Sequence, residues 1–164
     1  MMNNFVKYIF FDVDGVLSAP AYFDDKTHDY VIGFSDEGWA EFLNNEGIYS
    51  YRHCKCVPQI ISFINEAKNN NCQLYVLSAA MNELEVDAKA LFLEENYQDI
   101  FEKYYFVRHD IDKIKVIKDF CLEKKCEIND CMLIEDTYDT LLKAHCEGII
   151  AVHISNILAN NISK

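Results

Sequence analysis

Two aspartates one residue apart, Asp12 and Asp14, follow an apolar run from Phe5 to Phe11, and Asp14 directly precedes a glycine, Gly15. The aromatic and β-branched residues of this run predict a strand buried on both faces. Alternate side chains of an extended segment point to the same side, so both carboxylates are expected together at the carboxyl end of the strand. A bound cation or a catalytic task usually accounts for such a repulsive pair. The alternative is a polar strand end with solvated carboxylates.

Three later segments also place polar residues at the ends of predicted elements. Ser78 ends an apolar strand, and Lys113 stands in the first turn of a helix whose apolar residues repeat with helical spacing. Glu135 and Asp136 end another apolar strand, which is followed by a helix, a glycine and a last strand. Taken singly, Ser78 could be a helix N-cap and Lys113 a solvated surface charge.

In this order, the four segments resemble the four motifs of the haloacid dehalogenase (HAD) superfamily, most of whose members are Mg²⁺-dependent phosphatases. The resemblance covers residues 5 to about 154. It implies an α/β fold, a three-layer Rossmann-like parallel sheet with helices on both faces. It also implies one HAD-like hydrolase domain over residues 1–164, with a short flap or cap insert at about 18–56, after the first strand.

The resemblance assigns a role to each motif residue. Asp12 would be the nucleophile that forms an aspartyl-phosphate, and Asp14 would be the general acid and then the general base. Ser78 and Lys113 would bind the phosphoryl oxygens. Mg²⁺ would be held by Asp12, by Asp136 and by the backbone carbonyl of Asp14.

Two more acids are candidates to support the metal ligands. Glu135 stands where the family more often has Gly or Asp, and Asp139 lies one residue before the position that often carries Asp or Asn, which Thr140 occupies here. The dehalogenase branch lacks the second aspartate of the first motif, so Asp14 argues against carbon–halogen hydrolysis.

The order of predicted elements independently favours a parallel sheet covered on both faces, because strands and helices alternate along the chain. No internal repeat or linker interrupts this alternation. The predicted helices and strands after the insert are a helix at 58–70, a strand ending at Ser78, a helix at 81–95, a strand at 104–107, a helix from Lys113, a strand ending at Asp136, a helix from Thr137, a strand at 149–153, and a short helix or frayed tail at 155–164.

The insert is rich in aromatic and acidic residues. We expect a hairpin flap and a helix around Trp39 to Leu43, and we favour a small satellite core for most of the aromatic side chains. Arg52 and His53 are the positively inclined groups near its end, so either could touch substrate. The aromatic residues of the insert are Tyr22, Phe23, Tyr30, Phe34, Trp39, Phe42, Tyr49 and Tyr51.

The amino-acid composition limits the classes of partner that the protein is expected to bind. The 164 residues carry a formal net charge of −12, and 51% of them are hydrophobic. This acidity argues against a nucleic-acid or anionic-membrane surface. No apolar run approaches a membrane span, and the start of the chain does not resemble a signal peptide, so a cytoplasmic protein is expected.

Seven cysteines are scattered without a paired framework, which favours free thiols of a reducing compartment. His53, Cys54 and Cys56 look like half of a zinc site, but a second half with matching spacing is missing. Cys121 and Cys126, on and just past a predicted helix, are separated by four residues.

The sequence therefore predicts a Mg²⁺-dependent phosphatase that hydrolyses small or larger phosphate monoesters. Two alternatives stay open. A phosphomutase would use the same aspartyl-phosphate but needs a cap that excludes water, and the short insert argues against it. A non-catalytic binding or regulatory module would keep the fold without needing the carboxylate cluster.

Overall fold

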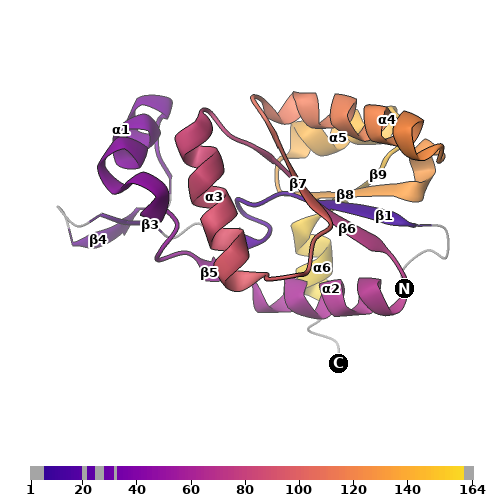
Figure 1. Ribbon diagram of the computed structural model, residues 1–164, viewed down its shortest axis with the longest axis horizontal. Helices are drawn as coiled ribbons and strands as arrows, with labels where there is room; N and C mark the ends of the chain where they lie inside the picture. Colours follow the sequence, from indigo (N-terminus) through magenta and orange to yellow (C-terminus); the bar gives the residue numbers. More distant parts are fainter. Residues whose placement is uncertain (1–5, 20–21, 25–27, 32, 161–164) are drawn as a thin grey trace.

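The computed structural model describes residues 6–19, 22–24, 28–31 and 33–160. Within them, five parallel strands form one sheet in the order β7-β6-β1-β8-β9 (Figure 1). The predicted Rossmann-like sheet is confirmed. The strands are β1 (Tyr8–Phe11), β6 (Gln73–Ala79), β7 (Lys103–Val107), β8 (Cys131–Glu135) and β9 (Ile150–His153). The first strand begins at Tyr8, so it is shorter than the apolar run from Phe5 to Phe11 that predicted it. Phe5 lies outside the described residues.

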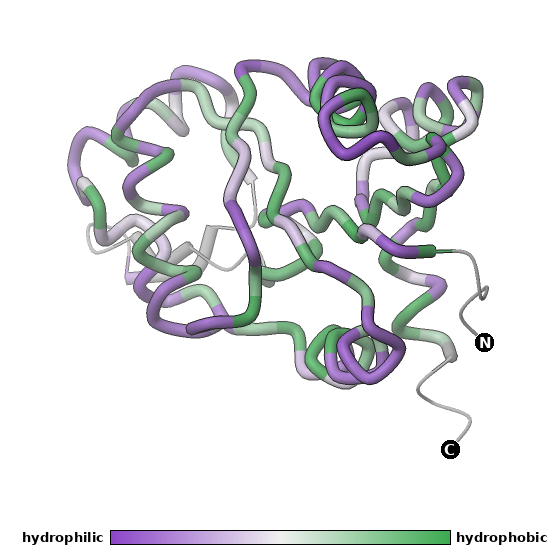
Figure 2. Tube along the Cα trace, turned by 45° about the vertical axis from the view of Figure 1, so that its right-hand side comes forward, coloured by the Kyte–Doolittle hydropathy of each residue, from purple (hydrophilic) through white to green (hydrophobic). Residues whose placement is uncertain are grey.

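Helices cover both faces of the sheet. On one face lie α2 (Pro58–Asn69) and α6 (Ile154–Asn160), and on the other lie α4 (Lys113–Lys124) and α5 (Tyr138–Cys146) (Figure 1). Alternation along β1 explains how one strand serves both layers. Ile9 and Phe11 pack in the α2 and α6 layer, whereas Phe10 meets Phe120 of α4 edge-on at 5.1 Å between ring centroids. In Figure 2 the central strands are mostly hydrophobic, and the helices alternate between hydrophobic and hydrophilic residues.

The insert and α3 (Glu83–Asn96) lie beyond the carboxyl ends of the strands (Figure 1). The predicted hairpin and helix are both present, and the helix extends further than expected on each side. Ser35 caps its first turn by accepting a hydrogen bond from Gly38 N at 3.1 Å. The elements of the insert are β2 (Ser18–Ala19), the antiparallel hairpin of β3 (Tyr22–Asp24) and β4 (Asp29–Val31), α1 (Asp36–Glu46), the 3₁₀ turn η1 (Gly47–Tyr49) and β5 (Lys55–Cys56), which pairs with β2.

Aromatic packing fixes the insert against α3. Trp39 stacks on Phe42 at 5.7 Å and meets Tyr51 edge-on at 6.0 Å, and Tyr51 contacts Phe92 of α3 at 5.9 Å. These rings join the core on the α2 side of the sheet, so the expected satellite core is in fact continuous with the main one. The side chains of Tyr22, Phe23 and Tyr30 lie outside the described ones.

Two short 3₁₀ turns, η2 (Asp110–Asp112) and η3 (Ile128–Asp130), lead into α4 and β8. Helix α3 begins at Glu83 rather than at Met81, because Asn82 is its N-cap. None of the helices in the described residues is long and apolar enough to cross a bilayer.

Candidate active site

The polar residues singled out in the sequence meet at one edge of the sheet. Strand β1 pairs in parallel with β6 on one side and with β8 on the other. The carboxyl ends of adjacent parallel strands lie together, and this edge is where open α/β sheets bind ligands. Asp12 follows β1, Ser78 lies near the end of β6, and Glu135 ends β8.

Lys113 lies at the centre of this group, at the start of α4. Its fully buried Nζ is 3.1 Å from Asp12 Oδ1, 2.6 Å from Glu135 Oε2 and 2.8 Å from Asp110 Oδ1. Burial lowers the pKa of Lys113, but the three carboxylates outweigh it and raise the pKa above its ordinary value. Asp12, Asp110 and Glu135 could in principle hold a metal ion together, but the ammonium group already occupies the space between them.

Asp12 is a buried carboxyl group with only 5% of its surface exposed. Burial raises its pKa, the Lys113 charge opposes this, and the nearby Glu135 adds to it, so the pKa rises to about 7. Lys113 Nζ lies within ion-pair distance of Oδ1 of Asp12, but this oxygen has no hydrogen-bond partner among the described residues. A buried oxygen in this state is suited to a ligand.

Asp14 is held from two sides by residues that the sequence analysis did not assign to the site. The Tyr51 hydroxyl donates to Oδ1 at 2.9 Å, and the Lys89 ammonium lies 2.7 Å from Oδ2. Tyr51 comes from the end of the insert and Lys89 from α3. The side chain of Asp14 therefore has a fixed orientation at the mouth of the site.

Ser78 is buried within β6 and is not an N-cap, so that alternative is wrong; Asn82 caps α3 by accepting from Glu85 N at 3.0 Å. The Ser78 hydroxyl accepts a hydrogen bond from Lys89 Nζ at 3.2 Å. Lys89 is 2% exposed and also lies 2.9 Å from Glu85. Burial lowers the pKa of Lys89, but Asp14 and Glu85 outweigh it and raise the pKa.

Asp136 lies on the other side of the first-motif turn, against Gly15. A Cβ atom added to Gly15 would lie 2.1 Å from Asp136 Oδ2, and the φ of Gly15 is +71°, so the turn requires glycine for both reasons. The His153 ring contacts the backbone carbonyl of Asp136 at 3.1 Å. Asp136 itself is exposed, and its carboxylate is open to solvent.

The residues around this edge fit a Mg²⁺ ion. Carboxyl oxygens outnumber the two ammonium groups, the buried Asp12 Oδ1 lacks a hydrogen-bond partner among the described residues, and Asp136 is packed over the turn that carries Asp14. Hard oxygen ligands of this kind suit Mg²⁺.

The two other acidic candidates differ in position. Glu135 is fully buried; it binds Lys113 and accepts hydrogen bonds from the backbone N–H groups of Asp136 and Thr137, both at 3.2 Å. It therefore supports the turn that carries Asp136. Asp139 is exposed in the first turn of α5, while Thr140 beside it is buried.

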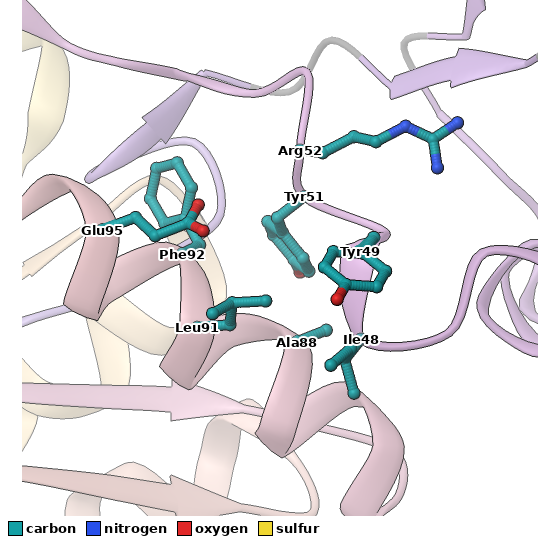
Figure 3. A pocket seen from close by; sticks show the side chains of 8 residues that line it. All are labelled: Ile48, Tyr49, Tyr51, Arg52, Ala88, Leu91, Phe92 and Glu95. Carbon is teal, nitrogen blue, oxygen red and sulfur yellow. The ribbon is translucent and has the colours of Figure 1, made fainter.

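A small pocket lies between η1 and α3 (Figure 3). Its volume of about 200 Å³ includes space that is open to solvent, so it is a surface hollow and not an enclosed cavity. Tyr51 belongs to its wall, and the same side chain bonds Asp14. The lining residues are Ile48, Tyr49, Tyr51, Arg52, Ala88, Leu91, Phe92 and Glu95. Arg52 pairs with Glu46 and His53 at the rim.

Several solved structures share this fold. A haloacid dehalogenase-like family hydrolase from Streptococcus pneumoniae is 19% identical, with a TM-score of 0.63 over 94% of this chain and 92% of that chain. An HAD-family enzyme from Bacteroides thetaiotaomicron, in complex with magnesium and inorganic phosphate, is 12% identical, with a TM-score of 0.57 over 90% and 93%. The cobalt-bound deoxy-D-mannose-octulosonate 8-phosphate phosphatase from Haemophilus influenzae is 14% identical, with a TM-score of 0.54 over 92% and 69%.

No protein-family model matches the sequence, and no curated protein matches it significantly. The likeness is therefore one of architecture, at identities well below those at which sequence alone shows descent. The superpositions cover 90% to 94% of this chain, which includes its five-stranded parallel sheet. The chain has the fold of the haloacid dehalogenase-like hydrolases.

Proposed function

We propose that this protein is a Mg²⁺-dependent phosphate monoester hydrolase that works through an aspartyl-phosphate. The observation that carries the proposal is the environment of Asp12. Its carboxyl group is buried beside the Lys113 ammonium at the edge of the sheet, with one oxygen that lacks a hydrogen-bond partner among the described residues. A carboxylate placed in this way is a nucleophile that desolvation has made more reactive.

The first chemical step would use two aspartates. A carboxylate oxygen of Asp12 attacks phosphorus, the bond between phosphorus and the leaving oxygen breaks, and Asp14 gives that oxygen a proton. In the second step Asp14 takes a proton from water, and the water oxygen attacks phosphorus and releases Asp12 and inorganic phosphate. Tyr51 and Lys89 orient the Asp14 side chain, because each contacts one of its two oxygens.

Two other side chains would bind the phosphoryl oxygens. Ser78 offers a buried hydroxyl, and Lys113 offers a positive charge beside Asp12. Because Glu135 and Asp110 also contact the Lys113 ammonium, at 2.6 and 2.8 Å, it is held in position without the substrate. This preorganisation is the usual source of electrostatic stabilisation in phosphoryl transfer.

Mg²⁺ would be held by Asp12, Asp136 and the backbone carbonyl of Asp14. When bound, it would neutralise charge on the phosphoryl oxygens. The magnesium and phosphate in the Bacteroides thetaiotaomicron complex, and the phosphatase activity in the name of the Haemophilus influenzae protein, support this choice of ion and substrate class. The substrate is a small or larger phosphate monoester rather than a nucleic acid, given the net charge of −12.

A panel of phosphorylated metabolites, assayed for release of inorganic phosphate with Mg²⁺ and with EDTA, tests the proposal. We expect Mg²⁺-dependent release that Asp12→Asn abolishes. A trapped phosphoenzyme, seen by mass spectrometry on Asp12 after a rapid quench, would separate this mechanism from direct attack by water. Hydrolysis that continues in EDTA, or that survives Asp12→Asn, would contradict it.

A further inference from the structure

Three cysteines gather at the opposite edge of the sheet from the candidate active site. Cys121 lies in the last turns of α4, Cys126 just after that helix, and Cys131 begins β8. Their Sγ atoms all lie within 4.8 Å of one another, and those of Cys121 and Cys131 are 3.4 Å apart. Four residues separate each cysteine from the next. We refer to these three residues as the thiol cluster.

The backbone holds the thiol cluster in place. Lys125 ends α4 in the left-handed conformation at φ +54°, and Cys126 N then donates to Cys121 O at 3.1 Å. The next turn is closed by Asp130, whose carboxylate accepts from Glu127 N at 3.1 Å and pairs with Lys7 at 3.1 Å. The three sulfurs are therefore brought together by a fixed helix end and turn.

We propose that the thiol cluster binds one soft metal cation through three thiolates. A zinc–sulfur bond of about 2.3 Å places sulfurs in a tetrahedral or trigonal site roughly 3.8 to 4.0 Å apart, which small side-chain rotations reach from the present positions. Thiolates select Zn²⁺ or Cu(I) over Mg²⁺ or Ca²⁺. A disulfide would use two of the sulfurs and leave the third without a role, so the three-way arrangement favours a metal.

The burial of the three thiols determines how a metal ion would reach them and which protons it must displace. Cys121 and Cys131 are buried, whereas Cys126 is half-buried and gives access from solvent. Burial is the main cause that raises the pKa of Cys126, to about 11, and it also raises the pKa of Cys131. The metal must therefore release protons from the thiols, and its affinity should rise with pH.

The site would stabilise rather than catalyse. Strand β8 carries Cys131 at its start and Glu135 at its end, so the sheet itself separates the thiol cluster from the phosphate-binding edge. A metal here would join the end of α4 to the start of β8. These are the two elements that carry Lys113 and Glu135 at their other ends.

Titration of the full reduced chain with Cd²⁺ tests the proposal, because thiolate-to-cadmium charge transfer absorbs in the ultraviolet. We expect one Cd²⁺ per chain and a higher melting temperature, with roughly a hundredfold weaker binding in Cys126→Ser. Cys56→Ser is the matched control, since Cys56 is also half-buried, lies outside the thiol cluster and belongs to the sequence that resembles half a zinc site. Competition by Zn²⁺ and by Cu(I) then identifies which ion is preferred.

Cys126→Ser is the safest variant because Cys126 is less buried than the other two, and melting in EDTA checks that it folds. Absence of charge-transfer absorption in the wild type would overturn the proposal. So would equal binding by wild type and a folded Cys126→Ser, or loss of binding in Cys56→Ser instead. A Cys121–Cys131 disulfide that forms under mild oxidation, without any metal binding to the reduced chain, would also overturn it.

Discussion

Replacing Asp12 by asparagine should stabilise the metal-free protein while removing its activity. Asparagine has almost the shape of a protonated aspartic acid, so the packing around the site is kept. In the wild type, burial raises the pKa of Asp12 from 3.8 to about 7. The folded protein therefore holds a proton on Asp12 at pH values where the unfolded chain has lost it, and ionisation of the folded state opposes folding.

The two pKa values of Asp12, unfolded and folded, set the sign and size of the change in stability. Between about pH 4 and pH 7 the folded state binds more protons than the unfolded state, so the contribution of Asp12 to stability is present at low pH and is lost as the pH rises toward 7. Each pH unit corresponds to about 1.4 kcal/mol, which sets an upper limit of about 4 kcal/mol above pH 7. We expect Asp12→Asn to be more stable by about 2 to 4 kcal/mol at pH 8 and by about 1 kcal/mol at pH 5.

Urea unfolding in EDTA at several pH values from 5 to 8 measures this difference directly. Asp119→Asn is the control, because it removes the same charge from an exposed position on α4 and should change stability by less than about 1 kcal/mol. The activity of Asp12→Asn should fall by roughly a thousandfold or more. Equal stability of Asp12→Asn and wild type at pH 8, or a difference that does not change with pH, would refute the reasoning.

The remaining predictions concern other residues of the site. Mg²⁺ at about a hundred times its Kd should raise the free energy of unfolding by about 3 kcal/mol in thermal or urea melts, and Asp136→Ala should lose this response; an unchanged response would exclude Asp136 as a ligand. Gly15→Ala should destabilise the protein by about 1 to 3 kcal/mol and weaken Mg²⁺ binding, because the new Cβ meets Asp136 Oδ2 in a backbone conformation at φ +71°; a melting temperature equal to wild type would contradict this. Lys113→Met should destabilise by about 3 to 5 kcal/mol, since it leaves buried carboxylates without their cation; chemical denaturation checks it. Tyr51→Phe should lower kcat by about tenfold with little change in stability, because it releases one oxygen of Asp14; an unchanged kcat would exclude a role for this hydrogen bond.

The sequence alone was sufficient for the sheet and for most of the residues at its edge. Runs of buried apolar residues identify strands such as Cys131–Glu135, and polar residues at their ends identify the edge where ligands bind. In a parallel sheet the carboxyl ends of all strands lie at one edge, so Asp12 and Asp136 were expected at the same edge; the pairing of β1 with β8, which makes them neighbours, came from the structure. The expected hairpin and helix of the insert were also predictable, because turn and capping residues act locally.

The tertiary structure alone decided which side chains complete the site. Glu85 and Lys89 are spaced as an ordinary exposed ion pair on a helix, yet Lys89 is buried and reaches Asp14 and Ser78. Tyr51 belongs to an insert whose position depends on ring packing against Phe92, which no local pattern reports.

The surroundings of the thiol cluster and of Lys113 were likewise decided only by the tertiary structure. Periodicity places Cys121 and Cys126 on or near one helix, but only the turn before β8 brings Cys131 to them. Lys113 is predicted at the start of its helix, but its three carboxylate partners come from three separate segments. Local sequence determines which elements form and which apolar faces they bury, because hydrophobic periodicity and backbone hydrogen bonding follow short-range patterns. The partner that each buried charge finds depends on contacts between distant segments, and these exist only once the chain has packed.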